Sequence, residues 1–234
     1  MHMKNMDLKY FLLITFPRIA LIFFIFCIIA SMYIYPGSTY INHDTTGYLF
    51  NQNFLSDLGR TITHGGQNNF HSSLLFNISL IFGGITYIVF FSLTHEIFNS
   101  NTLSRIGSFL GVGGALSMIG VGLTPSDLFY DLHVFFNMWI FRFFLLSTLC
   151  YSWLIYRHNG INNYYLTGNL IFIIFLLTYV LILIYGPSPR ESSFALTFQV
   201  TSQKIILFNF ILSVLVQTIA YRKIICSKKK YCER

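Results

Sequence analysis

The sequence predicts an all-α fold, a polytopic membrane protein built as one bundle of six transmembrane helices. Of its 234 residues, 54% are hydrophobic and 10% are charged, whereas about 25% of the residues in a soluble domain are charged. There are 26 Phe but only 8 Asp and Glu, too few charges to cover a water-soluble surface. The apolar runs are unbroken and about 20 residues long, the length of a membrane-spanning helix and about twice that of a transmembrane β-strand.

Six apolar segments account for the helices, in a single integral membrane domain over 1–234. They lie near 11–35, 70–95, 105–124, 133–156, 166–186 and 203–222. The first segment follows two lysines, as in a signal peptide. It is longer than a signal-peptide core and no small-residue cleavage site follows it, so we expect it to remain as a helix. The long connection 36–69 is rich in Gly, Asn, Ser and Thr and predicts a loop with a function of its own.

The distribution of basic residues predicts the orientation. With a cytoplasmic amino terminus, ten Lys and Arg lie on the cytoplasmic side and three on the outer side, and basic residues resist translocation. Six of the ten form a basic cytoplasmic tail over 222–234, which explains the net charge without nucleic acid as a partner. We predict a location in the cell (cytoplasmic) membrane, both termini cytoplasmic and membrane lipids as partners. A protein partner or a homo-oligomer stays open.

Two stripes of residues predict how the helices pack. In the third segment, Gly107, Gly111 and Ala115 recur every four residues, so neighbouring helix backbones can approach closely there. In the last segment, polar residues at 209, 213 and 217 have the same spacing. They share one helix face, which should lie against protein.

Polar and titratable residues gather at the predicted outer ends of the second and fourth segments and in the loops beside them. A cleft lined by such groups suits a lipid headgroup or a small polar ligand. We therefore predict an outer-facing polar ligand site. Its candidate residues are Asp57, His71, Asn77, Asp127, Asp131, His133, Asn137 and Arg142.

An enzymatic use of the same region stays open. Imidazole and carboxylate groups ligate catalytic zinc, and the candidate ligands are His64, His71, Asp131 and His133. No H-E-x-x-H or similar local motif accompanies them, so no cofactor is predicted and a zinc-like metal is the alternative. Without a metal, the catalytic candidates are Ser56, Asp57 and His133, although no G-x-S-x-G context surrounds the serine.

Arg142 lies within the fourth apolar segment, nine residues beyond His133. A charge at the membrane centre costs about 2.5 to 3.5 kcal/mol on insertion scales, so we expect Arg142 to face the bundle interior or a wet cavity. No Asp or Glu lies within an apolar segment. Arg142 is therefore either a structural hydrogen-bonding centre or a contact for an anionic ligand.

Three short stretches resemble a known family. They are Phe54-Leu55-Ser56-Asp57-Leu58-Gly59, Phe76-Asn77 with Gly83-Gly84, and Gly120-Val121-Gly122-Leu123-Thr124-Pro125-Ser126-Asp127 followed by His133. Together they are similar to the bacterial and archaeal membrane proteins called domain of unknown function 998, with Asp57 where Glu is usual and Thr124 where an aromatic residue is usual. The match covers about residues 50–145 and, more loosely, the whole six-helix length.

The resemblance implies a set of site positions and a ligand class. The positions are Ser56, Asp57, Gly59, Asn77, Pro125 and His133. The family has no established activity, but its layout is broadly similar to the eukaryotic Frag1/DRAM/Sfk1 membrane proteins, which are linked to lipid-anchor remodelling and lipid organisation. This analogy favours a lipid as the ligand, although a shared fold is weak support for a shared function.

The leading prediction is a multi-pass protein that binds or moves a lipid or small amphiphile through the outer-facing polar site. One alternative is a membrane-embedded hydrolase or transferase that uses the His and Asp cluster, with or without a metal. A second alternative is an accessory subunit of a membrane complex.

Overall fold

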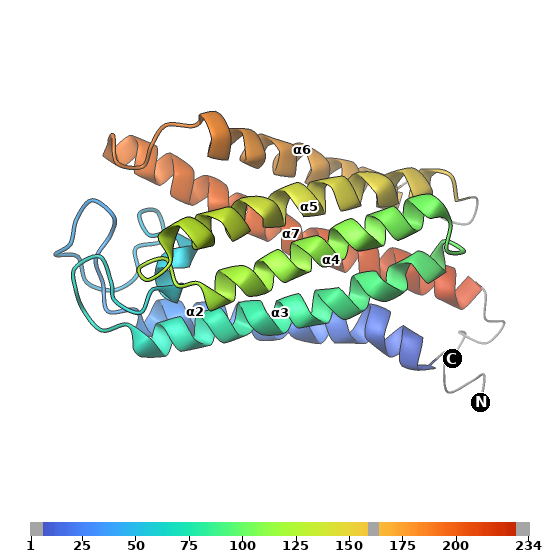
Figure 1. The fold of residues 1–234 in the computed structure, drawn as a ribbon, viewed down its shortest axis with the longest axis horizontal. Coiled ribbons are helices and arrows are strands. Elements are labelled where there is room, and N and C mark those ends of the chain that lie inside the picture. Colours follow the sequence, from blue (N-terminus) through green and yellow to red (C-terminus); the bar gives the residue numbers. More distant parts are fainter. Residues whose placement is uncertain (1–6, 159–163, 228–234) are drawn as a thin grey trace.

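Six long helices run along one axis and form most of the fold (Figure 1). A computed structural model describes residues 7–158 and 164–227. The elements are the π-helical turn η1 (Phe11–Thr15), α2 (Phe16–Ile34), the 3₁₀ turn η2 (Leu55–Gly59), α3 (Phe70–Ile97), α4 (Thr102–Leu123), α5 (Tyr130–Tyr156), α6 (Tyr164–Tyr185) and α7 (Ser193–Ser227). No β-strand occurs in these two ranges. With η1 continuing into α2, six helices are long and apolar enough to cross a membrane, which confirms the predicted all-α class and helix number.

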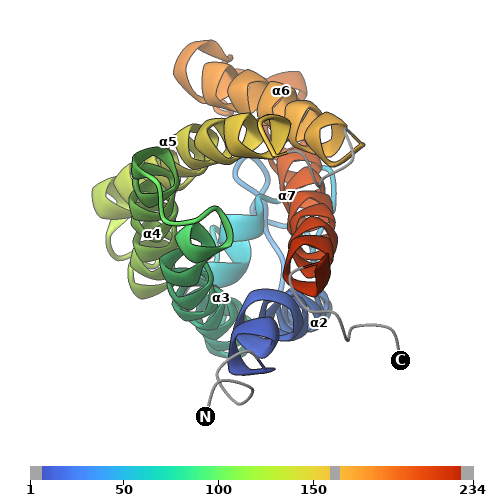
Figure 2. The same ribbon diagram turned by 90° about the vertical axis from the view of Figure 1, so that its right-hand side faces the viewer.

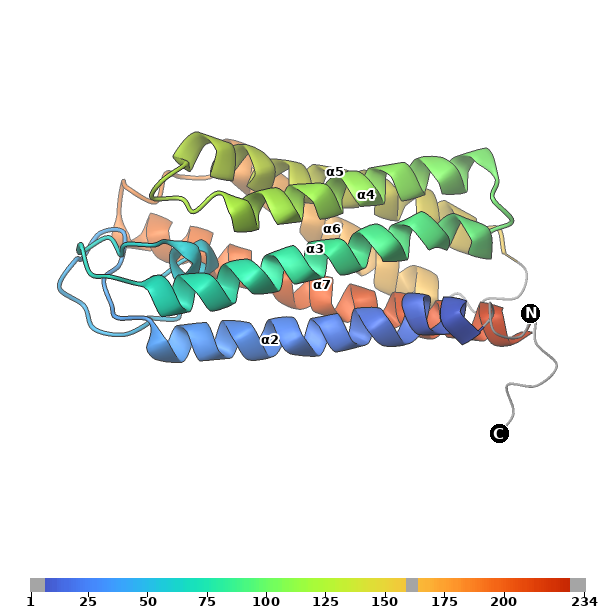
Figure 3. The ribbon, with the colours of Figure 1, turned by 60° about the horizontal axis from the view of Figure 1, so that its bottom comes forward.

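Helices that follow one another in the chain lie side by side, and α7 returns to α2, so the bundle closes into a ring (Figure 2). The connections 35–69, 124–129 and 186–192 gather at one end, called the loop end below. The first helix begins and α7 ends at the opposite end (Figure 3). The chain therefore builds its longest ordered loop over one mouth of the ring.

Several helices begin before the predicted residues, and the starts of α5 and α7 bear on the loop end. Helix α7 begins at Ser193, ten residues before the predicted 203. The extension is stable because Ala195, Leu196 and Val200 are buried, and the Gln199 side-chain amide donates a hydrogen bond of 3.1 Å to the carbonyl of Pro187. Helix α5 begins at Tyr130, so Asp131 lies in its first turn.

Glycines bring α3, α4 and α5 into close contact, as the small-residue stripe predicts. A Cβ atom on Gly111 would lie 2.3 Å from the ring of Phe91, and one on Gly107 would lie 3.1 Å from Cβ of Cys150. The polar stripe on α7 is confirmed in part. Its two members nearest the end of the helix, Ser213 and Gln217, are buried and share a hydrogen bond of 3.3 Å.

Candidate functional site

Asp57 organises the long loop. Its side chain is buried within η2, and one carboxylate oxygen accepts hydrogen bonds from the backbone N–H of Phe54 at 2.9 Å and the side-chain amide of Asn53 at 3.1 Å. The other oxygen lies 3.0 Å from Nε2 of His64. A buried carboxylate with three hydrogen-bonding partners is strongly held, so Asp57 fixes the conformation of the loop around it.

The His64 side chain also makes its contacts within the long loop. Besides Asp57, its ring contacts Tyr40 edge to face with centroids 5.1 Å apart and stacks on His43 at 6.5 Å. Arg190, from the connection between α6 and α7, in turn lies over the Tyr40 ring at 5.4 Å. These contacts tie two loops together through aromatic and cation–π interactions.

Two further polar residues hold η2 on helix α3. Side-chain donors from Ser73 and Asn77 both reach the carbonyl of Gly59, at 2.9 and 3.0 Å. A Cβ atom on Gly59 would lie 2.7 Å from Oδ1 of Asn77, so a larger residue at 59 would push η2 off the helix. Asn77 and Gly59 therefore position η2 at the mouth of the ring.

Asp127 joins the connection between α4 and α5 to the long loop. Its carboxylate accepts hydrogen bonds from the backbone N–H groups of Thr61, at 2.9 Å, and Ile62, at 3.0 Å, and from the Thr61 hydroxyl. Burial alone would raise the pKa of Asp127, but these donors outweigh it and the net pKa is lowered.

This lowered pKa makes the loop junction sensitive to acid. Because the folded pKa lies below the unfolded value of about 3.9, Asp127 stabilises the fold above about pH 4 and loses that effect as the pH falls through the folded pKa. Between about pH 5 and pH 3, we expect wild type to lose more thermal stability than Asp127→Asn. Circular dichroism melts in detergent measure this, and equal losses in the two proteins would contradict the assignment.

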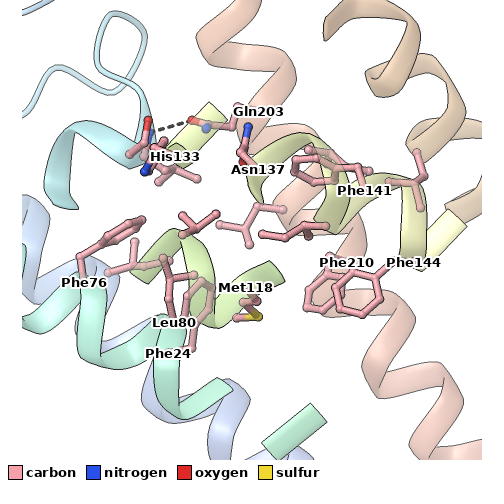
Figure 4. Close-up of a pocket in the computed structure, with 18 of the residues that line it drawn as sticks. Phe24, Phe76, Leu80, Met118, His133, Asn137, Phe141, Phe144, Gln203 and Phe210 are labelled. Atoms are coloured by element: carbon pink, nitrogen blue, oxygen red, sulfur yellow. Dashed lines mark hydrogen bonds between the residues drawn. The ribbon is translucent and has the colours of Figure 1, made fainter. Parts of the chain in front are cut away.

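A cavity lies between the helices next to η2 (Figure 4). It holds about 810 Å³ of space not filled by protein atoms, its open side included. Each of the six long helices contributes apolar lining, exemplified by Phe24, Leu80, Met118, Phe144, Phe172 and Phe210. Four polar residues also line it, namely Ser56, His133, Asn137 and Gln203.

The polar groups lie at the η2 side of the cavity, and the labelled apolar side chains extend away from them (Figure 4). His133 is fixed by a hydrogen bond of 2.7 Å between Nδ1 and the carbonyl oxygen of Thr124. A carbonyl only accepts, so Nδ1 carries the proton; in the neutral ring Nε2 is then an acceptor, and no donor from the described residues reaches it. Gln203 accepts from the backbone N–H of Leu55 at 2.7 Å, which leaves its amide N–H₂ as a donor.

Asn137 and Ser56 complete the polar end of the cavity. Asn137 lies four residues after His133, one helical turn further along the same face of α5. Within residues 7–158 and 164–227, no hydrogen bond engages the side chain of Asn137 or of Ser56. The cavity therefore presents hydrogen-bonding groups of both kinds at one end and hydrocarbon elsewhere.

Other predicted site residues lie elsewhere. His71 and Asp131 are exposed at helix starts, and Asp57 and His64 are paired inside the loop. Among the described residues, no three His, Cys, Asp or Glu side chains are close enough to hold a metal ion. The four candidate metal ligands are thus dispersed, and Ser56 lines the cavity while its neighbour Asp57 belongs to the loop.

Arg142 lies on the outer face of α5, where the sequence analysis had expected an inward position. It does not line the cavity, and its guanidinium lies 5.2 Å from the centroid of the Trp139 ring. The cavity-lining residues 133, 137, 140, 141 and 144 occupy the opposite side of the helix. The physical reason is that α4 and α6 cover the two flanks of α5 and leave this face to the surroundings.

Sequence reasoning missed Gln203 and the apolar lining. Gln203 fell at the edge of the predicted last segment, where a polar residue reads as a helix end. Phe and Leu that face a cavity have the same sequence pattern as those that face lipid, so no signal in a single sequence identifies the lining.

These features define a class: an all-α bundle of six potential membrane spans with an amphipathic cavity under an ordered loop. No protein-family model, no curated protein and no solved structure matches this chain. The resemblance to domain of unknown function 998 therefore stays a prediction.

Proposed function

We propose that this protein spans the cell membrane and binds an amphiphile with an uncharged polar head in the cavity. The observation that carries the proposal is the division of the cavity lining into a polar end at His133 and Asn137 and an apolar remainder. Membrane lipids are the natural source of such a ligand. We place the loop end outside and the termini in the cytoplasm, because ten of thirteen assigned basic residues then lie inside.

The tail of the ligand would occupy the apolar part. From residue 133 to residue 144 the cavity follows α5 for eleven residues, or about 16 Å of helix. This is about half of the 30 Å hydrocarbon core. A single acyl or isoprenoid chain could lie along this length, among the apolar lining residues.

The head would be neutral and would both donate and accept hydrogen bonds. None of the cavity-lining residues in the described chain is Asp, Glu, Lys or Arg, and an unpaired ion in such a site is costly. Nε2 of His133 needs a donor such as a hydroxyl, while the amides of Asn137 and Gln203 offer donors to a hydroxyl or carbonyl oxygen. Monoacylglycerols and long-chain alcohols have this chemistry.

A headgroup series tests the proposal. Native mass spectrometry would compare dodecyl-chain ligands that share a tail and differ in the head: monolauroylglycerol, laurate, dodecyl phosphate and dodecyltrimethylammonium. We expect the neutral ligand to bind at least tenfold more tightly than any ion, a difference of about 1.4 kcal/mol. Equal binding of all four would refute the neutral head, and binding of none would refute the amphiphile site itself.

A matched pair of variants on α5 localises the ligand. Ile140→Trp places a larger side chain in the cavity, and Leu146→Trp makes the same kind of change on the exposed outer face. We expect Ile140→Trp to weaken monolauroylglycerol binding by at least about tenfold because the tail loses its space. Leu146→Trp should bind as wild type does. Loss of binding in both variants, or in neither, would place the ligand elsewhere.

A further inference from the structure

The Arg142 guanidinium lacks a hydrogen-bonding partner among the described residues, and it lies outside the cavity. Across residues 7–158 and 164–227 its guanidinium has no hydrogen-bond or ion-pair partner, and it lies over the Trp139 ring. A guanidinium carries five N–H donors, and a cation–π contact satisfies none of them in a hydrogen-bonding sense. The donors therefore remain available on the outside of the bundle.

Arg142 lies in the middle of α5, too far from either helix end for its guanidinium to reach water. Twelve residues precede it in the helix and fourteen follow, which puts it about 18 Å and 21 Å from the two helix ends. Long basic side chains reach the membrane interface from positions near helix ends, not from the middle of a span. With α5 across a membrane, the charge lies at the depth where an unpaired Arg is most costly.

The surface around Arg142 has the spacing of a helix-packing face. Residues Phe135, Trp139, Arg142, Leu146, Leu149 and Trp153 recur at alternating intervals of four and three residues. Four of these side chains are between 45% and 56% exposed. This is the 3.5-residue period that keeps one face of a helix against a partner helix along its length.

A second copy of this chain cannot supply the missing charge. Seven of the eight acidic residues lie at helix ends or in loops of the described chain, and Glu233 follows the last helix in the sequence. No carboxylate of another copy would therefore reach mid-membrane depth beside Arg142. The partner that complements this face is a different protein.

We propose that the outer face of α5 binds a transmembrane helix of another protein that carries an Asp or Glu at mid-membrane depth. The carboxylate would accept hydrogen bonds from the Arg142 guanidinium, and the partner's apolar side chains would pack along the stripe. Charge-assisted pairs of this kind are the usual arrangement of ionised residues inside membranes. This interface is independent of the cavity and its ligand.

The experiment uses designed single-span helices as probes. Full-length protein with a donor fluorophore fused to its carboxyl terminus is reconstituted in phosphatidylcholine vesicles, and acceptor-labelled Leu/Ala helices with a central Glu or a central Gln are titrated in. We expect the Glu helix to reach half-maximal energy transfer at about a tenfold lower peptide-to-lipid ratio, about 1.4 kcal/mol. Arg142→Leu should abolish this preference, and Arg142→Lys should keep part of it.

Controls separate the interface from general effects. Arg105→Leu removes a positive charge at the exposed start of α4 and should leave the Glu preference intact. Helical content by circular dichroism verifies that Arg142→Leu folds, as expected when a charge is removed from an apolar surface. The proposal fails if wild type does not distinguish Glu from Gln, if Arg142→Leu keeps the preference, or if copies of the protein associate through Arg142 without any probe helix.

Discussion

Asp57→Ala is expected to remove about 1 to 3 kcal/mol from the free energy of unfolding, the range for leaving buried hydrogen-bonding groups without their partner. The carboxylate accepts from Phe54 and Asn53 and contacts His64, so its loss leaves buried donors without partners. The effect should extend to the cavity, because Leu55 and Ser56 of the same turn line it. We therefore expect lower thermal stability and weaker amphiphile binding together.

Asp44→Ala is the matched control for this experiment. Asp44 is an exposed acid in the same loop, so its removal changes the charge without unpairing buried donors. Thermal melts followed by circular dichroism in detergent compare the two variants, with native mass spectrometry for bound monolauroylglycerol. Similar melting temperatures for the two variants would show that Asp57 does not organise the loop.

The helices could be predicted because each is a long apolar run, and such runs have few alternatives to helical structure in a membrane. The predicted helix boundaries were less accurate where tertiary packing extends a helix beyond its apolar run. The first ten residues of α7 contain Gln199 and four hydroxyl residues, and the predicted last segment began only after them. They are helical because Ala195 and Val200 pack against the bundle, which hydropathy alone does not reveal.

The site could be predicted only in part. His133 and Asn137 were expected in a ligand site, and both line the cavity. Asp57, His64 and Asp127 were grouped with them because they lie at the same predicted end of the bundle, but each side chain is engaged within or between the loops. A sequence shows which polar residues are near one end of the bundle. The direction of each side chain depends on loop geometry, which has no periodic signal.

Arg142 illustrates the same limit on a helix. Its depth follows from counting residues, and its cost at that depth follows from the membrane. The predicted inward direction of the Arg142 side chain was wrong. It was expected because, for a protein without a partner, an inward charge has a lower free-energy cost than one that faces lipid. The observed outward position agrees with a protein that completes its charge pairing with a partner, so the deviation from the expected pattern is itself the basis for the proposed interface.

Gly84→Ala is expected to destabilise the protein by about 1 to 2 kcal/mol, because overpacking costs about 1 to 3 kcal/mol and helix propensity returns at most about 1 kcal/mol. A Cβ atom on Gly84 would lie 2.8 Å from the carbonyl oxygen of Ala115 and 2.5 Å from Cγ1 of Ile119. The carbonyl belongs to the α4 backbone and cannot rotate away, so the two helices must separate.

Gly113→Ala makes the same substitution where the neighbour can move. The added Cβ atom would lie 3.2 Å from the ring of Phe143, a side chain that can shift by a few tenths of an ångström. Propensity should then offset the contact, and we expect a change within about 0.5 kcal/mol of wild type. Chemical or thermal unfolding of the two variants measures the difference. Equal stabilities of the two variants would mean that the fold does not need the close approach of α3 and α4 at Gly84. If Gly84→Ala is destabilised but still binds monolauroylglycerol, this contact does not shape the cavity wall formed by Leu80 and Met118.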